Sequence, residues 1–238
     1  MIDNAEWKGI IDVWKSGQIS LPGVIRWSKY SNTEKDGGAR VQNSLQHSYS
    51  LTILGRVITH KLKPYVSIDE SLLMTALLVH DHGEGEIQKD TLYIDKTVKG
   101  DVDEYIAFQK RYGSLGVDLY AEFERAFLLQ FALKDSSAFP VSARDIMKDI
   151  SSQNRNECLM FDGVERIDYL LYAVEQYMNR SNEKILVQTL RHQVSHLNRL
   201  AGELTGFGEA IWTQDLRKSL QDFLGRYEGQ WIEQKGEK

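Results

Sequence analysis

The chain of 238 residues carries a formal net charge of −5 and one cysteine. This length can bury a core without disulfides, and the lone Cys158 excludes an intrachain bridge, as in proteins of a reducing compartment. The acidic balance excludes a general binder of nucleic-acid polymers, which would present a basic surface. We find no signal peptide and no apolar run of the roughly 18 residues that a membrane span needs. We therefore expect a cytoplasmic protein without membrane contact.

Apolar periodicity predicts the fold class. The chain contains 3 prolines, and long stretches repeat their apolar residues with the period of a helix. We therefore expect an all-α protein with one domain over residues 1–238. Its helical-bundle core spans about residues 20–180, and additional C-terminal helices occupy 181–238.

The first predicted helix begins at an N-cap, Asp3 or Asn4, and ends at Gly17. Its apolar stripe, which we assign to the core, consists of Trp7, Ile10, Ile11 and Trp14. Residues 31–38 follow with the composition of an exposed loop.

The second predicted helix begins at Asn43 or Ser44, both residues that cap helix N-termini. His47 lies in its first turn. The apolar residues that share the face of His47 are Leu51, Leu54, Ile58 and Leu62. A single histidine on such a face is usually a hydrogen-bonded core residue, so further candidate ligands are needed before a site is inferred.

The third predicted helix opens with capping-box spacing over residues 67–70 and ends at His80 and Asp81. Helical spacing places both side chains on the buried face. A buried carboxylate beside an imidazole is costly unless it is paired, and a divalent cation satisfies both groups. The alternative is an ordinary helix terminus in which the two side chains bind loop amides and carbonyls. A short connection favours antiparallel packing, which brings His47 and His80 to the same end of the pair.

The rest of the chain is predicted to be largely helical. The expected segments are an irregular stretch at 88–100, a helical pattern from Asp101 to Leu133 that breaks near Gly113 or Gly116, a connector at 136–144, a helix through 164–178, and a last helix from Trp212. Asp168 lies on the apolar stripe of the helix through 164–178, so a metal or an arginine is expected as its partner. His192 and His196 form a second i, i+4 histidine pair, but it lacks the glutamate of a metalloprotease helix.

The four inward polar residues follow the order of a known family. His47, the pair His80-Asp81 and the later Asp168 resemble the HD-domain metal-dependent phosphohydrolases, over about residues 20–180. The resemblance implies an HD-type helical bundle that binds one divalent metal ion through His47, His80, Asp81 and Asp168. Manganese, cobalt, zinc, iron and magnesium all suit such ligands.

Within that superfamily the chain is most similar to the 5′-deoxynucleotidase branch, in which an Arg-Trp pair precedes the first histidine. Here the pair is Arg26-Trp27. By resemblance Arg26 holds the nucleotide phosphate and Trp27 packs at the sugar, although Trp27 has an equal claim to a place in the core. Asp90 is matched to a second acid of the branch, which would bind substrate. The separation between Arg26 and His47 is longer than the branch leads us to expect.

The resemblance implies an enzyme that removes phosphate from nucleotides, above all from deoxynucleoside 5′-monophosphates, by attack of a metal-bound hydroxide. Glu84, one turn beyond the ligands, would take the proton or orient the water; the alternative is a solvated carboxylate or the partner of a lysine. Deoxynucleoside triphosphates or (p)ppGpp are alternative substrates of the same site. A non-catalytic nucleotide-sensing module is the alternative of another class. We expect the small-molecule substrate and a second copy of the chain, in a homodimer, as partners.

Overall fold

The computed structural model describes residues 5–27, 42–88, 91, 95–180 and 183–225, and within these ranges the fold is all-α apart from one two-stranded sheet. The elements are, in chain order, α1 (Ala5–Lys15), the π-helix η1 (Ser16–Ser20), α2 (Leu21–Gly23), β1 (Ile25–Arg26), β2 (Gln42–Asn43), α4 (Ser44–Leu62), α5 (Glu70–Val79), α6 (His82–Ile87), α7 (Val98–Tyr112), α8 (Val117–Leu128), the 3₁₀-helix η3 (Leu129–Phe131), α9 (Val141–Gln153), α10 (Arg155–Arg180), α11 (Glu183–Glu203), α12 (Phe207–Ala210) and α13 (Gln214–Gly225). In the described part of the chain, no helix is both long enough and apolar enough to cross a membrane. Three predictions lie outside the described residues: the N-cap at Asp3 or Asn4, the loop at 31–38, and the substrate-binding role of Asp90.

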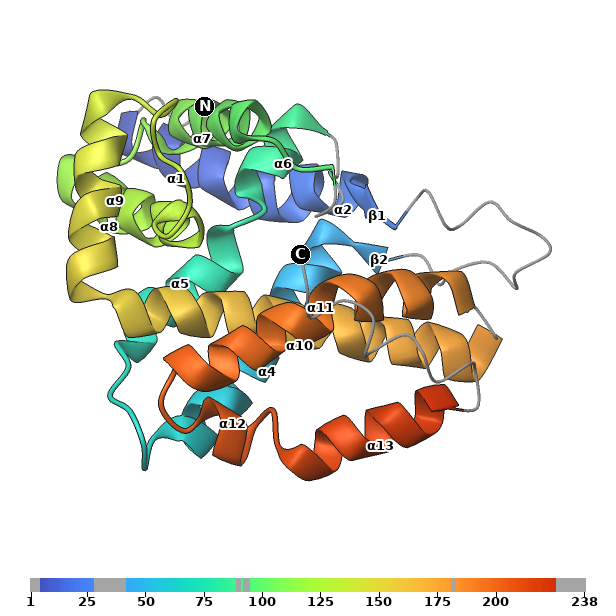
Figure 1. The fold of residues 1–238 in the computed structure, drawn as a ribbon. Coiled ribbons are helices and arrows are strands. Elements are labelled where there is room, and N and C mark those ends of the chain that lie inside the picture. Colours follow the sequence, from blue (N-terminus) through green and yellow to red (C-terminus); the bar gives the residue numbers. More distant parts are fainter. Residues whose placement is uncertain (1–4, 28–41, 89–90, 92–94, 181–182, 226–238) are drawn as a thin grey trace.

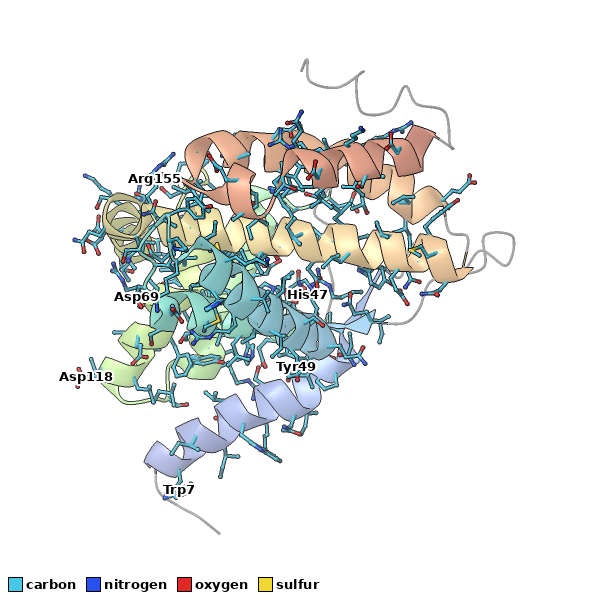
Figure 2. The ribbon with its side chains drawn as sticks, turned by 90° about the horizontal axis from the view of Figure 1, so that it is seen from below. Trp7, His47, Tyr49, Asp69, Asp118 and Arg155 are labelled. Atoms are coloured by element: carbon cyan, nitrogen blue, oxygen red, sulfur yellow. The ribbon has the colours of Figure 1, made fainter. Side chains whose placement is uncertain are left out.

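The long helix α10 forms the axis of the molecule, and α11 runs alongside it (Figure 1). On its other side α10 packs against α4 and α5, so that it lies between two layers, as Figure 2 shows from below. The helices α6, α7 and α8 extend the core beyond the end of α5. Residues in the middle of α10 therefore face the place where α4 begins and α5 ends.

Side-chain caps fix the starts of the two helices that carry the predicted histidines. Asn43 and Gln46 form a reciprocal capping box at α4: Asn43 Oδ1 accepts from Gln46 N at 2.9 Å, and Gln46 Oε1 accepts from Asn43 N at 3.1 Å. At α5 the cap is Asp69, whose Oδ1 accepts from Leu72 N at 3.0 Å. The predicted start at Ser67 is thus two residues early. The backbone N–H of Asp69 donates to Glu157 Oε1 at 2.6 Å, which ties the start of α5 to α10.

A two-residue antiparallel sheet joins the segment before α4 to the start of that helix. Arg26 pairs with Gln42, and Ile25 pairs with Asn43. The pairing places Arg26 directly beside the first turn of α4. Trp27, which follows, has a positive φ of 62°, a conformation that is strained for a bulky residue.

The prediction that the apolar stripe of the first helix belongs to the core is wrong. Trp7, Ile10 and Trp14 are 51%, 42% and 60% exposed, and Trp7 points away from the body of the protein (Figure 2). The helix docks through a different side. A Cβ at Gly9 would lie 2.6 Å from the carbonyl oxygen of Ser114, so α1 approaches the turn after α7 at its glycine.

Of two further predictions about the middle of the chain, one is confirmed and the other is wrong in its boundary. The helical pattern from Asp101 to Leu133 is interrupted at Gly113–Gly116, as expected, and divides into α7, α8 and η3. The connector predicted at 136–144 is shorter than expected because α9 begins at Val141. Its buried residues, Ala143, Met147 and Ile150, lie at i, i+4 and i+7, so the helical period is present in the sequence, and the prediction placed the start of this helix too late.

Gly83 allows α6 to pack directly on the backbone of α7. A Cβ at this position would lie 2.4 Å from the carbonyl oxygen and 3.0 Å from the Cα of Glu104. These atoms belong to a helix backbone, so they cannot rotate away. Because Gly83 immediately follows His82 and precedes Glu84, this contact sets the position of Glu84.

We predict that Gly83→Ala destabilises the protein by about 1–3 kcal/mol, the usual range for overpacking. The measurement is the midpoint of urea unfolding. Gly202→Ala is the matched control, because a Cβ at Gly202 in α11 meets no atom within 4 Å, and alanine favours a helix. Equal midpoints for the two variants would contradict the close packing of α6 on α7.

Cys158 is buried in α10, where it is 4% exposed. Burial, with the charge of Glu157 as a smaller cause, raises the pKa of its thiol from 9.0 to about 12. At pH 8 the reactive thiolate is therefore about a thousandfold scarcer than in the unfolded chain.

We predict that the native protein reacts with iodoacetamide at pH 8 about a thousandfold more slowly than the urea-unfolded protein, and that the native rate rises about tenfold per pH unit below pH 11. Mass spectrometry of timed samples measures both rates. Rapid alkylation of the native protein at pH 8 would show that the thiol is accessible and ionised.

Candidate metal centre

The two predicted histidines meet in the buried interior. His47 lies in the first turn of α4 and is fully buried, and His80 is the C-cap of α5 and is 2% exposed. Their ring centroids are 5.3 Å apart, with the rings inclined at 69°. The prediction that antiparallel packing brings His47 and His80 to the same end of the helix pair is confirmed.

Hydrogen bonds on the Nδ1 side orient both rings. His47 Nδ1 lies 2.9 Å from Asp168 Oδ2, and His80 Nδ1 lies 3.0 Å from the carbonyl oxygen of Leu77. The Leu77 carbonyl oxygen can only accept a hydrogen bond, and so can the Asp168 carboxylate in its ionised form. Each Nδ1 therefore donates, and carries the hydrogen atom. Each Nε2 atom is buried and has no hydrogen-bond partner among the described residues. In the neutral rings both Nε2 atoms present a lone pair to the same space.

A glutamate of α10 faces these two lone pairs. Glu165 Oε1 lies 3.6 Å from His80 Nε2 and 4.0 Å from His47 Nε2. The three groups offer one ligand atom each, and these atoms lie within 4.8 Å of one another. Two imidazoles and a carboxylate at this spacing can bind a first-row divalent metal ion.

Asp81 completes the cluster on the side of His80. Its Oδ1 lies 3.1 Å from His80 Nε2, and its Oδ2 accepts a hydrogen bond from Arg26 Nη1 at 2.8 Å. Burial raises the pKa of Asp81, but His80 and Arg26 lower it by more, so the pKa is held well below its ordinary value. Asp81 is therefore an ionised carboxylate that connects the cluster to Arg26.

Without a cation, protons supply the positive charge that the carboxylates require. Burial and Arg26 lower the pKa of His47, whereas Asp168 and Glu165 raise it by more, to about 9. Burial raises the pKa of Glu165, but the facing His47 and His80 imidazoles lower it by more, to about 2. A proton at His47 Nε2 and a metal ion at the cluster therefore compete.

Asp168 has a different position from the one predicted. Its expected partner was a metal or an arginine, but its carboxylate accepts from His47 Nδ1, on the side of the ring away from Glu165. Glu165 lies one helical turn before Asp168 and takes the place at the Nε2 atoms. A carboxylate on the far nitrogen of a ligating histidine fixes the tautomer and increases the basicity of the other nitrogen.

Arg26 and Trp27 are both buried, at 7% and 3% exposed. Besides Asp81, Arg26 reaches Tyr169 Oη at 3.4 Å and lies 3.9 Å from Glu84 Oε2. Trp27 stacks on Tyr172 with centroids 4.8 Å apart, and its Nε1 donates to Gln42 Oε1 at 3.2 Å. Arg26 therefore belongs to the site, whereas Trp27 packs as a core residue.

Glu84 is buried beside the cluster, at 1% exposed, and is not a solvated carboxylate. Lys96 Nζ lies 3.2 Å from Glu84 Oε1 and 3.5 Å from Glu104 Oε2. Burial raises the pKa of Glu84 to about 8, although Lys96 opposes the shift. The lysine partner that the sequence left open is thus Lys96.

The structure brings together six of the eight predicted site residues: His47, His80, Asp81, Asp168, Arg26 and Glu84. Trp27 packs in the core, and Asp90 lies outside the described residues. Sequence reasoning missed Glu165, Lys96 and Tyr169. Glu165 could have been found, because it lies three residues before Asp168 on the same helix face. Lys96 lies in an irregular segment between helices, where no periodicity indicates its direction.

Comparisons of the chain with protein-family models, with curated proteins and with solved structures gave no match. The geometry and chemistry of the cluster therefore carry the functional proposal.

We predict that Glu165→Ala weakens manganese or cobalt binding by more than about 100-fold and that Asp168→Ala weakens it by about 10- to 100-fold, the range for groups that orient a ligand. Equilibrium dialysis or titration calorimetry measures both affinities. Asp162→Ala, one turn before Glu165 on α10, is the control and should bind metal normally. A larger loss in Asp168→Ala than in Glu165→Ala would restore Asp168 as the direct ligand.

Proposed function

We propose that this chain is a metal-dependent phosphohydrolase of the HD-domain type that removes phosphate from nucleotides. The observation that carries the proposal is the buried meeting of two imidazole Nε2 atoms with the carboxylates of Glu165 and Asp81. Cationic side chains, Arg26 and Lys96, lie beside these groups, where a phosphate could bind.

The donor set fits one divalent cation. Two neutral imidazoles and two carboxylates bring two negative charges, which a divalent ion neutralises inside a buried site. Manganese, cobalt, zinc, iron and magnesium remain possible ions. When bound, such an ion acts as a Lewis acid that lowers the pKa of water and polarises phosphoryl oxygens.

The protein's own groups would bind and orient the phosphate ester. Arg26 has a planar fork of donors, of which Nη1 donates to Asp81. The guanidinium would therefore link the cluster to a phosphate bound beside it. Lys96 adds a second positive charge. Together they offset the charge that develops on the phosphate oxygens in the transition state.

Glu84 is the group that we assign to proton transfer. It is buried, it lies 3.9 Å from the same Arg26 Nη1 atom that binds Asp81, and its Oε1 pairs with Lys96 Nζ at 3.2 Å. In its ionised form, which the raised pKa of about 8 makes the minor form at pH 7, Glu84 can accept a proton from an attacking water molecule or hold that molecule in line. Its neighbour Lys96 keeps it positioned.

The expectation of deoxynucleoside 5′-monophosphates as substrates rests on the Arg26-Trp27 resemblance. Arg26 lies at the cluster, which supports a phosphate-binding role. Trp27 is stacked on Tyr172 inside the core, so it lends no support to a role at the sugar. Nucleotide phosphate esters are therefore the substrate class that we propose, with the monophosphates as the first to be measured.

We predict that protein stripped of metal releases no phosphate from deoxynucleoside monophosphates and recovers activity with manganese or cobalt, and that Glu84→Gln lowers kcat by about 10²- to 10⁴-fold, the usual range for a general acid–base residue. Phosphate release is measured across ribo- and deoxynucleoside mono-, di- and triphosphates. Metal affinity of Glu84→Gln is measured in parallel and should stay within a few-fold of the original protein.

A non-catalytic nucleotide sensor predicts another pattern. In that case the original protein and Glu84→Gln would bind metal and nucleotide equally and would both be inert toward every ester. Metal binding without hydrolysis of any ester would contradict the proposal that the protein is an enzyme acting on these substrates.

A further inference from the structure

An ammonium group lies between two buried carboxylates beside the candidate metal centre. Lys96 Nζ lies 3.2 Å from Glu84 Oε1 and 3.5 Å from Glu104 Oε2. The side chains of Glu84 and Glu104 are 1% and 5% exposed, and that of Lys96 is 23% exposed. Among the described residues, no other carboxylate pairs with Lys96 and no other cation pairs with Glu104. One positive charge is therefore shared by two carboxylates.

The two carboxylates come from helices that pack closely on each other. Glu84 lies in α6 and Glu104 lies in α7, and a Cβ at Gly83 would lie 2.4 Å from the carbonyl oxygen of Glu104. The backbone of Glu104 thus touches the residue before Glu84, while its side chain reaches the lysine that pairs with Glu84. Glu104 is therefore connected to Glu84 in two ways, through backbone packing and through Lys96.

The backbone beside Lys96 is held by a helix cap. Thr97, the next residue, is the N-cap of α7, and its Oγ1 accepts a hydrogen bond from Gly100 N at 3.1 Å. The cap fixes where α7 begins, four residues before Gly100 ends its first turn and one residue after Lys96. Lys96 therefore reaches both carboxylates from a backbone position that the start of α7 determines.

The surroundings of Lys96 keep it positively charged. The acidic side chains that act on it come from α6, α7, α10 and the turn between α5 and α6: Glu84, Glu104, Glu165, Tyr169 and Asp81. Burial lowers the pKa of Lys96, but Glu104 and Glu84 raise it by more, well above its ordinary value. Lys96 is therefore an ammonium ion at neutral pH, and it needs a counter-ion inside the protein.

A proton on Glu84 would change the pairing of Lys96. As a general base, Glu84 takes a proton from water, the water oxygen bonds to phosphorus, the bond from phosphorus to the ester oxygen breaks, and the alcohol leaves with a proton from solvent. Protonated Glu84 no longer neutralises Lys96. An ammonium that loses its counter-ion in a buried place is strongly destabilised, so a lysine paired with Glu84 alone would oppose the proton transfer. Glu104 remains beside Lys96 as a counter-ion in both states of Glu84.

We propose that Glu104 is a positioning residue: as the second counter-ion of Lys96, it keeps the lysine charged and in place while Glu84 carries a proton. Glu104 acts through Lys96 and not by contact with the substrate. The role of Glu84 as the base rests on the proposed phosphohydrolase function. The sharing of Lys96 between two carboxylates rests only on the contacts of the described residues.

The charge of Lys96 can be measured without any enzyme activity. Glu84→Gln replaces the carboxylate by a neutral side chain of the same shape, as protonation does. In this variant Lys96 should stay protonated to above about pH 10, because Glu104 remains as its counter-ion. In the double variant Glu84→Gln/Glu104→Gln, the pKa of Lys96 should fall by about two units or more, as for a buried lysine without a partner. NMR titration of the full chain with ¹³C-labelled lysines measures both values, and Lys96→Arg assigns the signal.

The matched control is the double variant Glu84→Gln/Asp101→Asn. Asp101 lies one turn before Glu104 on α7, is 6% exposed, and pairs with Lys134 at 3.4 Å. This variant also loses two buried carboxylates, but the pKa of Lys96 should stay close to that in Glu84→Gln. Equal pKa values of Lys96 with and without Glu104 would overturn the proposal, and so would equal falls in the two double variants. Circular dichroism and urea midpoints verify that the variants are folded.

A kinetic experiment tests the consequence for catalysis. In Glu104→Gln we expect the maximal kcat for deoxyadenosine monophosphate to fall about 10-fold with little change in KM, and the acid limb of the pH profile of kcat to move about one unit lower. The limb moves because Lys96, no longer shared, stabilises the ionised form of Glu84. Glu104→Asp keeps the charge but draws it back from Nζ, so it should move the limb in the same direction by less. Asp101→Asn should leave the limb in place.

The two experiments separate this proposal from the enzyme assignment. If the original protein hydrolyses nucleotides but the acid limb is the same in Glu104→Gln, the phosphohydrolase stands and the positioning role is overturned, even where kcat is lower. If the original protein hydrolyses no nucleotide, the phosphohydrolase and the catalytic role of Glu104 fall together. The NMR titration then decides alone whether Glu104 is the second counter-ion of Lys96.

Discussion

The buried meeting of imidazole lone pairs with carboxylate oxygens is the constraint on which the rest of the site depends. The Nδ1 atoms of His47 and His80 already have acceptors, so their Nε2 atoms face Glu165 and Asp81. Neutral rings and ionised carboxylates in that arrangement would repel one another in a medium of low polarity. A positive charge is therefore needed at the centre, and the fold leaves only a proton or a cation to supply it.

Three helices that are distant in the sequence, α4, α5 and α10, bring these imidazoles and carboxylates together. The capping box of Asn43 fixes where α4 begins, Asp69 fixes where α5 begins, and the contact between Asp69 and Glu157 ties that start to α10. Each tie involves backbone groups of helix termini, which need partners in any case. The hydrogen bonds that satisfy the terminal backbone groups of these helices thus also set the geometry of the cluster.

Local patterns predicted the helices and the inward histidines, because apolar period and caps act within a few residues. They failed where a partner distant in sequence decides the outcome. Trp14 lies on an apolar stripe that the fold leaves exposed, since α1 docks through Gly9. Asp168 and Glu165 share one helix face, and only the placement of His47 decides which carboxylate meets Nδ1 and which meets Nε2. Which carboxylate meets which nitrogen depends on the distance and orientation between α4 and α10. The spacing of residues along one helix does not determine that geometry.

The short sheet of β1 and β2 makes the position of Arg26 independent of the number of residues that connect the two strands. Because Arg26 pairs with Gln42, the position of Arg26 relative to His47 is set by two backbone pairings and one capped helix start, whatever number of residues connects the strands. Lengthening such a connection is cheap, since each doubling of a loop adds only about 0.6 kcal/mol of closure entropy. The unusual separation between Arg26 and His47 in this sequence is therefore compatible with an unaltered centre. The position of Arg26 at the centre thus depends on the register of this sheet and not on the number of residues between its two strands.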